Sequence, residues 1–256
     1  MTAKFLTALP TMAAATLLFL SGCASTGAPK ADPFEGMNRG TYAFNDAVDR
    51  AVFEPVAKGY QAITPQPVRS GINNAFLNVA DVGNSVNNLL QGKAAGAATS
   101  LGRFIVNSTL GVLGLFDVAT PMGLERQEED FGQTLGKWGL GSGPYVVIPF
   151  LGPSTFRDFT GRAVDSQLSW SRAVEHDKTR YSGMALEVID LRASLLGASK
   201  TLDEAALDKY QFLRDAYLQR RLRNVYDGKV PQDKADQLED DLVPPKAEAP
   251  KVEKKP

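Results

Sequence analysis

The sequence predicts an all-α protein, and three observations support that fold class. Apolar residues recur at spacings of three and four through most of residues 32–228, as they do on one face of a helix. Only residues 145–148 have the pattern of a strand, and one strand makes no sheet. Prolines, glycines and short polar residues separate the helical patterns. We therefore expect a single helical domain over residues 32–228.

The first 22 residues predict a lipoprotein signal peptide. Lys4 supplies a positive charge, residues 5–19 are apolar, and Leu20-Ser21-Gly22-Cys23 resembles the bacterial lipobox. The segment is too short to span a bilayer. Cys23, the only cysteine, is the predicted lipid attachment site; the alternative is that it merely ends an ordinary signal.

The residues after the signal predict how the mature chain is held. Each buried CH₂ contributes about 0.8 kcal/mol, so several acyl chains on one cysteine anchor a protein without a transmembrane helix. Residues 23–31 are expected to be a tether between lipid and fold. Ala24 and Ser25 lack the aspartate that resembles an inner-membrane retention signal, which favours the periplasmic face of the outer membrane.

The domain is expected to open with a helix. Asp32 can cap it, Pro33 suits its first position, and Glu35 stands three residues after the cap. Pro55 should end or kink this helix. The helix carries an apolar stripe, which we expect to pack in the core rather than against lipid: Met37, Thr41, Phe44, Val48 and Val52.

Two further helices are expected before residue 93. Pro67 fits the start of the first, Asp81 fits the cap of the second, and Gly92 is a plausible C-terminal cap. An alanine and glycine segment then leads into an apolar run that never reaches the roughly 20 residues of a spanning helix. Arg103 and nearby polar residues interrupt this run, which suits a helix that lies in an interface or faces a wet cavity.

Residues 101–158 are apolar and glycine-rich, with charges concentrated at residues 125–130. Glycine costs a helix roughly 0.5–1 kcal/mol relative to alanine. These glycines therefore indicate close backbone contacts or a backbone wall along a path, and an ordinary turn with a loop is the alternative. A short helix is expected at about 130–137, with Phe131 and Leu135 on one face, and Ser154 should cap another helix.

The C-terminal part predicts two amphipathic helices and a tail. The helices are expected at residues 181–197 and 203–226, each ending at a glycine. Beyond Pro231 the sequence is rich in charged residues and proline and has no aromatic residue. Because it is too polar to bury a core, residues 229–256 are predicted to be a disordered tail.

The residues offer no candidate for catalysis, a metal or a cofactor. His176 is the only histidine and lies in a charged stretch, so we expect it on the surface. A Ser-His-Asp triad, a G-x-S-x-G elbow and a zinc ligand set all lack their residues. A net charge of −1 without a basic cluster argues against nucleic-acid binding. Three functions remain: handling a hydrophobic ligand, scaffolding other envelope proteins, or an enzyme of unrecognised chemistry.

Several motifs together resemble one known family. They cover roughly residues 32–195 and include Asp32-Pro33-Phe34-Glu35-Gly36-Met37-Asn38-Arg39, Phe44-Asn45, Pro67-Val68-Arg69, Val86-Asn87-Asn88-Leu89-Leu90-Gln91-Gly92, Gly102-Arg103-Phe104, Asn107-Ser108-Thr109-Leu110-Gly111 and Phe131-Gly132-Gln133-Thr134-Leu135-Gly136. By these motifs the chain resembles the MlaA (VacJ) lipoproteins of Gram-negative outer membranes. The tail beyond Gly228 lies outside the resemblance.

The resemblance implies both a fold and a function. The implied fold is a ring of helices embedded in the inner leaflet of the outer membrane, with an amphipathic channel through it. The implied function is the removal of phospholipids from the outer leaflet and their transfer to a soluble periplasmic carrier. Trimeric porins, the carrier and the phospholipid are the implied partners. A structural lipoprotein that scaffolds porins without transporting lipid is the alternative.

The resemblance also implies a set of residues on the lipid path or its gate. Phe44 and Asn45 match a first-helix segment that bears on channel opening, Phe131 and Leu135 match the segment after a flexible hairpin, and Asp158 matches a polar residue beside the channel. Each has a packing alternative. The three apolar residues fit a core, and Asp158 could pair with Arg157 or Arg162.

Overall fold

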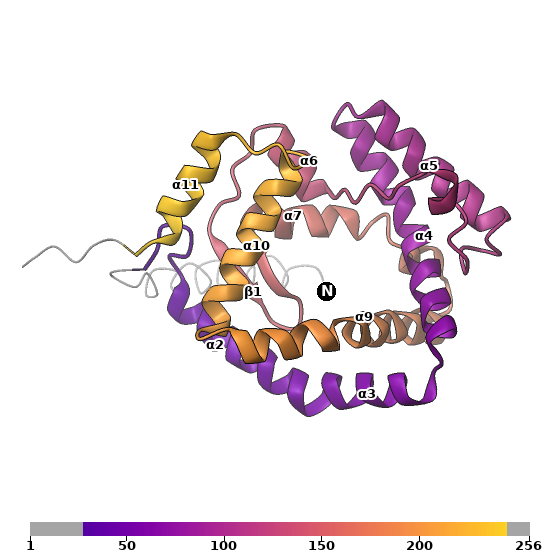
Figure 1. Cartoon of the computed structure of the whole chain (residues 1–256), viewed down its shortest axis with the longest axis horizontal. Coiled ribbons are helices and arrows are strands. Elements are labelled where there is room, and N and C mark those ends of the chain that lie inside the picture. Colours follow the sequence, from indigo (N-terminus) through magenta and orange to yellow (C-terminus); the bar gives the residue numbers. More distant parts are fainter. Residues whose placement is uncertain (1–27, 245–256) are drawn as a thin grey trace, which may run out of the picture.

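The computed structural model describes residues 28–244, whose helices form a ring around a central opening (Figure 1). The opening is bordered by α4 (Gln66–Leu90), α7 (Phe156–Asp165), α9 (Asp177–Ala205) and α10 (Lys209–Val225). Two sides are double, because α3 (Glu54–Ile63) lies along α9 and α5 (Ala94–Thr109) lies along α4. The remaining elements are α2 (Glu35–Val48), a π-helix (Asp49–Phe53), a 3₁₀ turn (Thr120–Met122), α6 (Phe131–Lys137), β1 (Tyr145–Ile148), β2 (Gly152–Thr155), α8 (Trp170–Ala173) and α11 (Gln232–Leu242).

Apolar burial is concentrated in one part of the ring. Tyr145 and Val147 of β1 pack against Tyr210 and Leu218 of α10, with the tyrosine rings edge to face. Elsewhere in the described residues the buried side chains are mainly polar, most of all in α4 and α5: Asn78, Asp81, Asn84, Asn87, Asn88, Ser100, Arg103 and Asn107. The apolar core is therefore small and lies beside β1.

The first helix differs from the prediction in which face it buries. Met37, Phe44 and Val52 of the apolar stripe are exposed, so the expected core packing of these residues was wrong. The buried face carries Asn38, whose amide donates to the Tyr145 carbonyl at 3.0 Å and accepts from the Val147 N–H at 2.9 Å. A strand edge needs hydrogen-bond partners, and here a side chain provides them.

The N-terminus of this helix also has a different cap from the one expected. Asp32 makes no side-chain cap. It is fully buried, where its carboxylate accepts hydrogen bonds from Asn38 at 2.7 Å and from the Tyr210 hydroxyl. Asp32 therefore joins the start of the fold to α10.

The chain stays helical through Pro55. A π-helix precedes it, and Pro55 lies in the first turn of α3. Proline has no N–H to donate to the preceding turn, and a wider turn accommodates this. The helix is thus interrupted at Pro55 but does not end there.

Residues 66–90 form one helix instead of the two expected. Asp81 caps nothing and is buried in the middle of α4, where two arginines neutralise it. Gly92 follows the helix with a φ of 77°, as predicted for a C-terminal glycine.

The segment expected to hold a lone strand is a hairpin. β1 pairs antiparallel with β2, and Thr155, not Ser154, caps α7 by accepting the Asp158 N–H at 3.2 Å. The sequence Gly152-Pro153-Ser154-Thr155 has few β-formers, which hid the second strand.

Residues 232–242 of the predicted disordered tail form α11, so that part of the prediction was wrong. Leu238 and Leu242 pack against the apolar core, and the Asp241 carbonyl accepts the Ala31 N–H at 3.0 Å. Two leucines spaced four apart were enough to dock a helix that is otherwise charged. The rest of the predicted tail, residues 245–256, lies outside the described residues, as do the signal peptide and Cys23.

Candidate functional site

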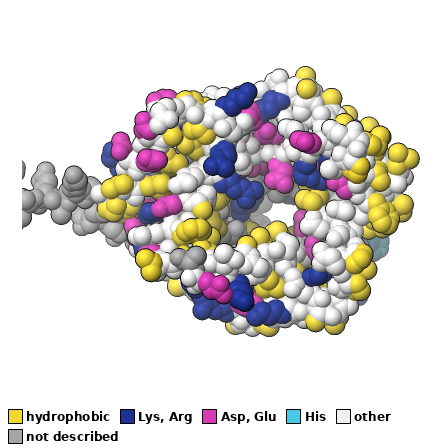
Figure 2. Space-filling model, in the orientation of Figure 1, with side chains coloured by type: hydrophobic (Ala, Val, Ile, Leu, Met, Phe, Trp, Pro, Cys, Tyr) yellow, Lys and Arg dark blue, Asp and Glu magenta, His cyan; other side chains and the backbone are white. Residues whose placement is uncertain are grey.

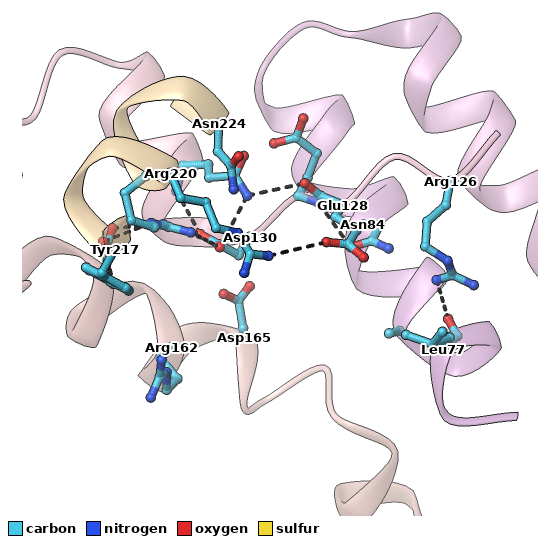
Figure 3. Close-up of a pocket in the computed structure, with 15 residues that line it drawn as sticks. Leu77, Asn84, Arg126, Glu128, Asp130, Arg162, Asp165, Tyr217, Arg220 and Asn224 are labelled. Atoms are coloured by element: carbon cyan, nitrogen blue, oxygen red, sulfur yellow. Dashed lines mark hydrogen bonds and ion pairs between the residues drawn. The ribbon is translucent and has the colours of Figure 1, made fainter. Parts of the chain in front are cut away.

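A cavity of about 410 Å³ opens on the inner side of the ring, between α4, α6, α7 and α10 (Figure 3). Figure 2 shows the molecule hollowed at its centre, with acidic and basic side chains gathered beside the hollow. The lining is predominantly charged and includes Arg126, Arg162, Arg220, Arg221, Glu128, Glu129, Asp130, Asp158 and Asp165. Charges of both signs therefore face the same space.

We call the charged lining of this cavity the charged wall, and one arginine joins three of its four helices. Arg221 of α10 binds Asp158 of α7 at 2.8 Å and also binds Asp130, the N-cap of α6. Tyr217 donates to Asp158 at 2.9 Å, and Arg157 binds the same carboxylate. Burial opposes ionisation of both aspartates, but hydrogen bonds from Arg221 hold the pKa of Asp130 and of Asp158 below the usual value.

α6 and α7 approach so closely that only glycine fits between them. A Cβ on Gly161 would lie 2.3 Å from the backbone nitrogen of Gly132. Next to this contact, Asp165 accepts the Phe131 N–H at 2.9 Å and the Asn87 amide at 3.0 Å, which ties α6 and α7 to α4. Burial raises the pKa of Asp165. The expectation of close backbone contacts is met here.

A second ionic cluster holds α5 and residues 117–126 against α4. Arg103 and Asp81 have no exposed side-chain surface and pair at 3.2 Å, and Arg126 binds the other oxygen of Asp81 at 2.7 Å. Arg103 also donates to Asp117, Thr120 and the Leu124 carbonyl. Buried charges are tolerated only when they are paired and hydrogen-bonded, and this cluster meets that condition.

The outer surface of α5 and of the loop that follows it is apolar. α5 and the loop after it expose large apolar side chains: Leu101, Ile105, Leu110, Val112, Leu113 and Phe116. Figure 2 shows hydrophobic side chains gathered along this edge of the ring. Val112 and Leu113 have φ values of 53° and 57°, a region that non-glycine residues rarely adopt. Within residues 28–244, no helix combines the length and the hydropathy required to cross a bilayer.

Comparison with known proteins decides the family. The family described as MlaA lipoprotein matches residues 30–224. The chain belongs to the MlaA lipoprotein family. Relatives from Shigella flexneri and Escherichia coli, each named "Intermembrane phospholipid transport system lipoprotein MlaA", are 36% identical over 239 residues, which is 87% of this chain and 92% of theirs.

A solved structure supports the same assignment. It was reported as the "Structural basis for maintenance of bacterial outer membrane lipid asymmetry" and is 34% identical to this chain, with a TM-score of 0.67. The match covers 76% of this chain and 98% of that one. The resemblance to the MlaA family and the all-α, ring-like fold are therefore confirmed.

The predicted path residues fall into two groups. Phe44 and Asn45 lie on α2 and hold the hairpin tip: the Asn45 amide donates to the Ile148 carbonyl at 3.0 Å and accepts the Phe150 N–H at 2.9 Å. The Phe44 ring packs edge to face on Phe150. Phe150 has a φ of 63°, so Asn45 stabilises a strained turn.

The other group lies at the charged wall. Asp158 lines the cavity and pairs with Arg157, as the packing alternative allowed, and also with Arg221. Phe131 begins α6 and packs edge to face on Trp138. Leu135, one turn further along α6, is half-buried. A role for these five residues in lipid passage stays a prediction.

Sequence reasoning missed the arginines that organise both clusters. Arg221 lies on the same face of α10 as the buried residues Leu218 and Val225. Arg103 lies within an apolar run. A cation at an apolar helical position requires a buried acidic partner, and that signal was available in the sequence.

Proposed function

We propose that this chain removes mislocalised phospholipids from the outer leaflet of the outer membrane and passes them to a periplasmic carrier. Relatives that share most of its length are named for intermembrane phospholipid transport. Its membership of the MlaA lipoprotein family supports this role. Lipid at Cys23 would hold the chain at the periplasmic face, and trimeric porins would surround it.

One observation carries this proposal: on the α4–α5 side of the ring the outer surface is apolar, whereas the cavity on the inner side is lined by charged residues. A phospholipid has a charged headgroup and two apolar tails. The apolar outer surface of α5 and its loop can lie among lipid tails, since that surface has no need of water. The charged wall then offers the headgroup polar partners that the bilayer interior lacks.

The residues of the charged wall suit the headgroup chemistry. Arg126, Arg162 and Arg220 border the cavity, and guanidinium groups bind phosphate oxygens with several parallel donors. Asp130 and Asp158 already neutralise Arg221, which therefore serves to hold α6, α7 and α10 together. Acidic side chains beside these arginines compete with a bound phosphate and so weaken its binding. Weak binding suits a transport path, because the path must release each lipid that it binds.

The test obstructs the opening without disturbing a buried contact. Ala80 is exposed on α4 and lines the cavity, so Ala80→Trp places a large ring there. Ala98, exposed on α5 away from the cavity, gives the matched control Ala98→Trp. We expect a strain lacking the protein to accumulate outer-leaflet phospholipid, and we expect Ala98→Trp but not Ala80→Trp to correct it.

Abundance and membrane attachment of each variant must be equal for this comparison. Leu135→Arg in the same strain tests the predicted path beside α6 and should also fail to restore asymmetry. If deletion leaves the outer leaflet unchanged, transport is refuted and a porin scaffold takes its place. If deletion raises outer-leaflet lipid but Ala80→Trp restores asymmetry fully, lipid does not pass through this opening.

A further inference from the structure

The helices α3, α4 and α9 meet at one corner of the ring (Figure 1). Residues of these three helices line a second cavity, of about 440 Å³. We call it the corner cavity. Apart from Ala193 and Gly197, its lining consists of amide and hydroxyl side chains and one charge of each sign, Arg69 and Asp190. The volume falls within the range of about 300–1,000 Å³ that is usual for small-ligand sites.

The two charges of the corner cavity are not paired with each other. Among the ion pairs of the described residues, none includes Arg69 or Asp190. Arg69 donates through Nη2 to Gln66, while its Nε is buried and has no partner within the described chain. Asp190 is almost fully buried and accepts one hydrogen bond, from the Tyr60 hydroxyl at 2.8 Å. The Nε of Arg69 lies too deep for a ligand to reach, but Nη1 has no acceptor among the described residues and can donate to a ligand in the cavity.

We propose that the corner cavity binds the headgroup of a zwitterionic phospholipid, with its phosphodiester on Arg69 and its primary ammonium on Asp190. The proposal rests on the proposed function and names the lipid class that the ring prefers. Asn73 and Ser70 have no side-chain hydrogen bond to another described residue and can donate to the remaining phosphate oxygens. An anionic headgroup with a neutral alcohol would satisfy Arg69 but leave Asp190 without its cation.

The surroundings of the corner cavity favour a lipid over a soluble phosphodiester. Asn74, in its lining, donates to the Leu115 carbonyl at 3.3 Å. Leu115 and Phe116 are exposed, so the rim continues into the apolar loop that follows α5. Acyl chains attached to a bound headgroup would find apolar surface there.

The corner cavity and the charged wall share one face of α4. Asn73 lines the first, and Leu77, Ala80 and Asn84 line the second. Their spacings of four, three and four place all four residues on the same side of the helix. A headgroup that leaves Arg69 can therefore move along α4 toward Arg126.

The experiment measures binding of two lipids to the full-length lipoprotein. The protein is purified in detergent and titrated with dioleoyl phosphatidylethanolamine or dioleoyl phosphatidylglycerol, and bound lipid is quantified by native mass spectrometry. We expect the wild type to bind phosphatidylethanolamine about tenfold more tightly, because it gains a charged hydrogen bond to Asp190. Asp190→Asn should remove this preference, and Arg69→Gln should weaken binding of both lipids about tenfold.

Two further variants keep the result interpretable. Asn73→Ala removes a cavity side chain that holds no other described residue, so the fold should be preserved while both lipids bind several-fold more weakly. Arg172→Gln removes an exposed cation on α8, outside the cavity, and should bind like the wild type.

The outcomes separate this proposal from the proposed function. If the wild type binds phospholipid but Arg69→Gln, Asp190→Asn and Asn73→Ala all bind as it does, the corner cavity is not the site and transport still stands. If the wild type binds neither lipid, the transport function fails as well. If glycerophosphoethanolamine binds as tightly as the lipid, the cavity holds a soluble phosphodiester and the lipid assignment is overturned.

Discussion

On the side of the ring formed by β1 and α10, aromatic and aliphatic side chains are packed together, whereas on the α4–α5 side the buried groups are amides, hydroxyls and charges. The outer surfaces show the opposite pattern, because the side with the polar interior has the more apolar exterior. α5 and its loop expose leucine, isoleucine and phenylalanine, and α10 exposes mainly arginine, glutamine and other polar residues.

The difference shows that the two sides are stabilised by different interactions. Around Tyr145 and Leu218, folding removes apolar surface from water, as in an ordinary globular core. Around Asp81 and Arg103, stability depends on hydrogen bonds and ion pairs that are strong because little water reaches them. Such a wall, polar inside and apolar outside, is suited to contact with lipid.

Arg103→Ala should have the largest effect on stability. It leaves Asp81 buried with a single cation. It also removes the hydrogen bonds that Arg103 donates to Asp117, Thr120 and the Leu124 carbonyl. Breaking one partner of a buried pair costs about 4 kcal/mol. We expect the free energy of unfolding in detergent, measured by circular dichroism in denaturant, to fall by that amount. Arg172→Ala, at an exposed position, is the control. A loss below about 1 kcal/mol would show that the cluster is not what holds α5.

Leu218→Ala tests the apolar side in the same assay. Leu218 is buried against Tyr145 and Tyr210, and removal of its side chain leaves a cavity. A loss of about 3 kcal/mol is expected, with exposed Leu207→Ala close to wild type. A loss below about 1 kcal/mol for Leu218→Ala would contradict the comparison, because this side of the ring would then not depend on apolar burial.

The parts of the fold that the sequence predicted are those with local signals. The helices at 130–137 and after Pro67 were predicted from caps and proline positions. The helix end at Gly92 was predicted because glycine readily adopts the left-handed backbone found there. Family motifs supplied the ring, because closure of helices around an opening depends on contacts between residues more than 100 positions apart, such as Asn38 with Val147.

The parts that were missed depend on partners that local patterns do not encode. Aspartate is a residue type that commonly caps helices, so Asp81 was expected at a helix start. It is stable inside α4 because Arg103 and Arg126 pair with it. The apolar stripe of α2 was placed in the core because periodicity shows which face is apolar and not which solvent that face meets. In a lipid environment the apolar face is the outer one.

Arg221→Gln should have a smaller and pH-dependent effect. Arg221 lowers the pKa of Asp130 and Asp158, so its stabilisation is present above their unfolded pKa of about 3.9 and is lost as the pH falls through the folded values. Since the site is partly open to solvent, we expect a loss of about 2 kcal/mol at pH 7 that shrinks below about pH 4.

The measurement for Arg221→Gln is the free energy of unfolding as a function of pH. Arg223→Gln, two residues further along α10, is the control for removal of a helical arginine. A loss that stays constant between pH 7 and pH 3 would mean that Arg221 acts through packing and not through its charge.

Leu113→Asn should have the smallest effect on folding, and it addresses the outer surface directly. Leu113 is 78% exposed with a φ of 57°, a backbone region that asparagine accepts better than leucine. The free energy of unfolding should therefore change by no more than about 0.5 kcal/mol. If the loop contacts lipid, the lost apolar surface should still weaken vesicle binding about tenfold in a chain that begins at Ala24 and carries no acyl anchor. Leu207→Asn, fully exposed at the α9–α10 connection, should bind vesicles like the wild type. Equal losses for the two variants would mean that exposed leucines act without regard to position, and the contrast between an apolar lipid-facing wall and a water-facing α10 side would not hold.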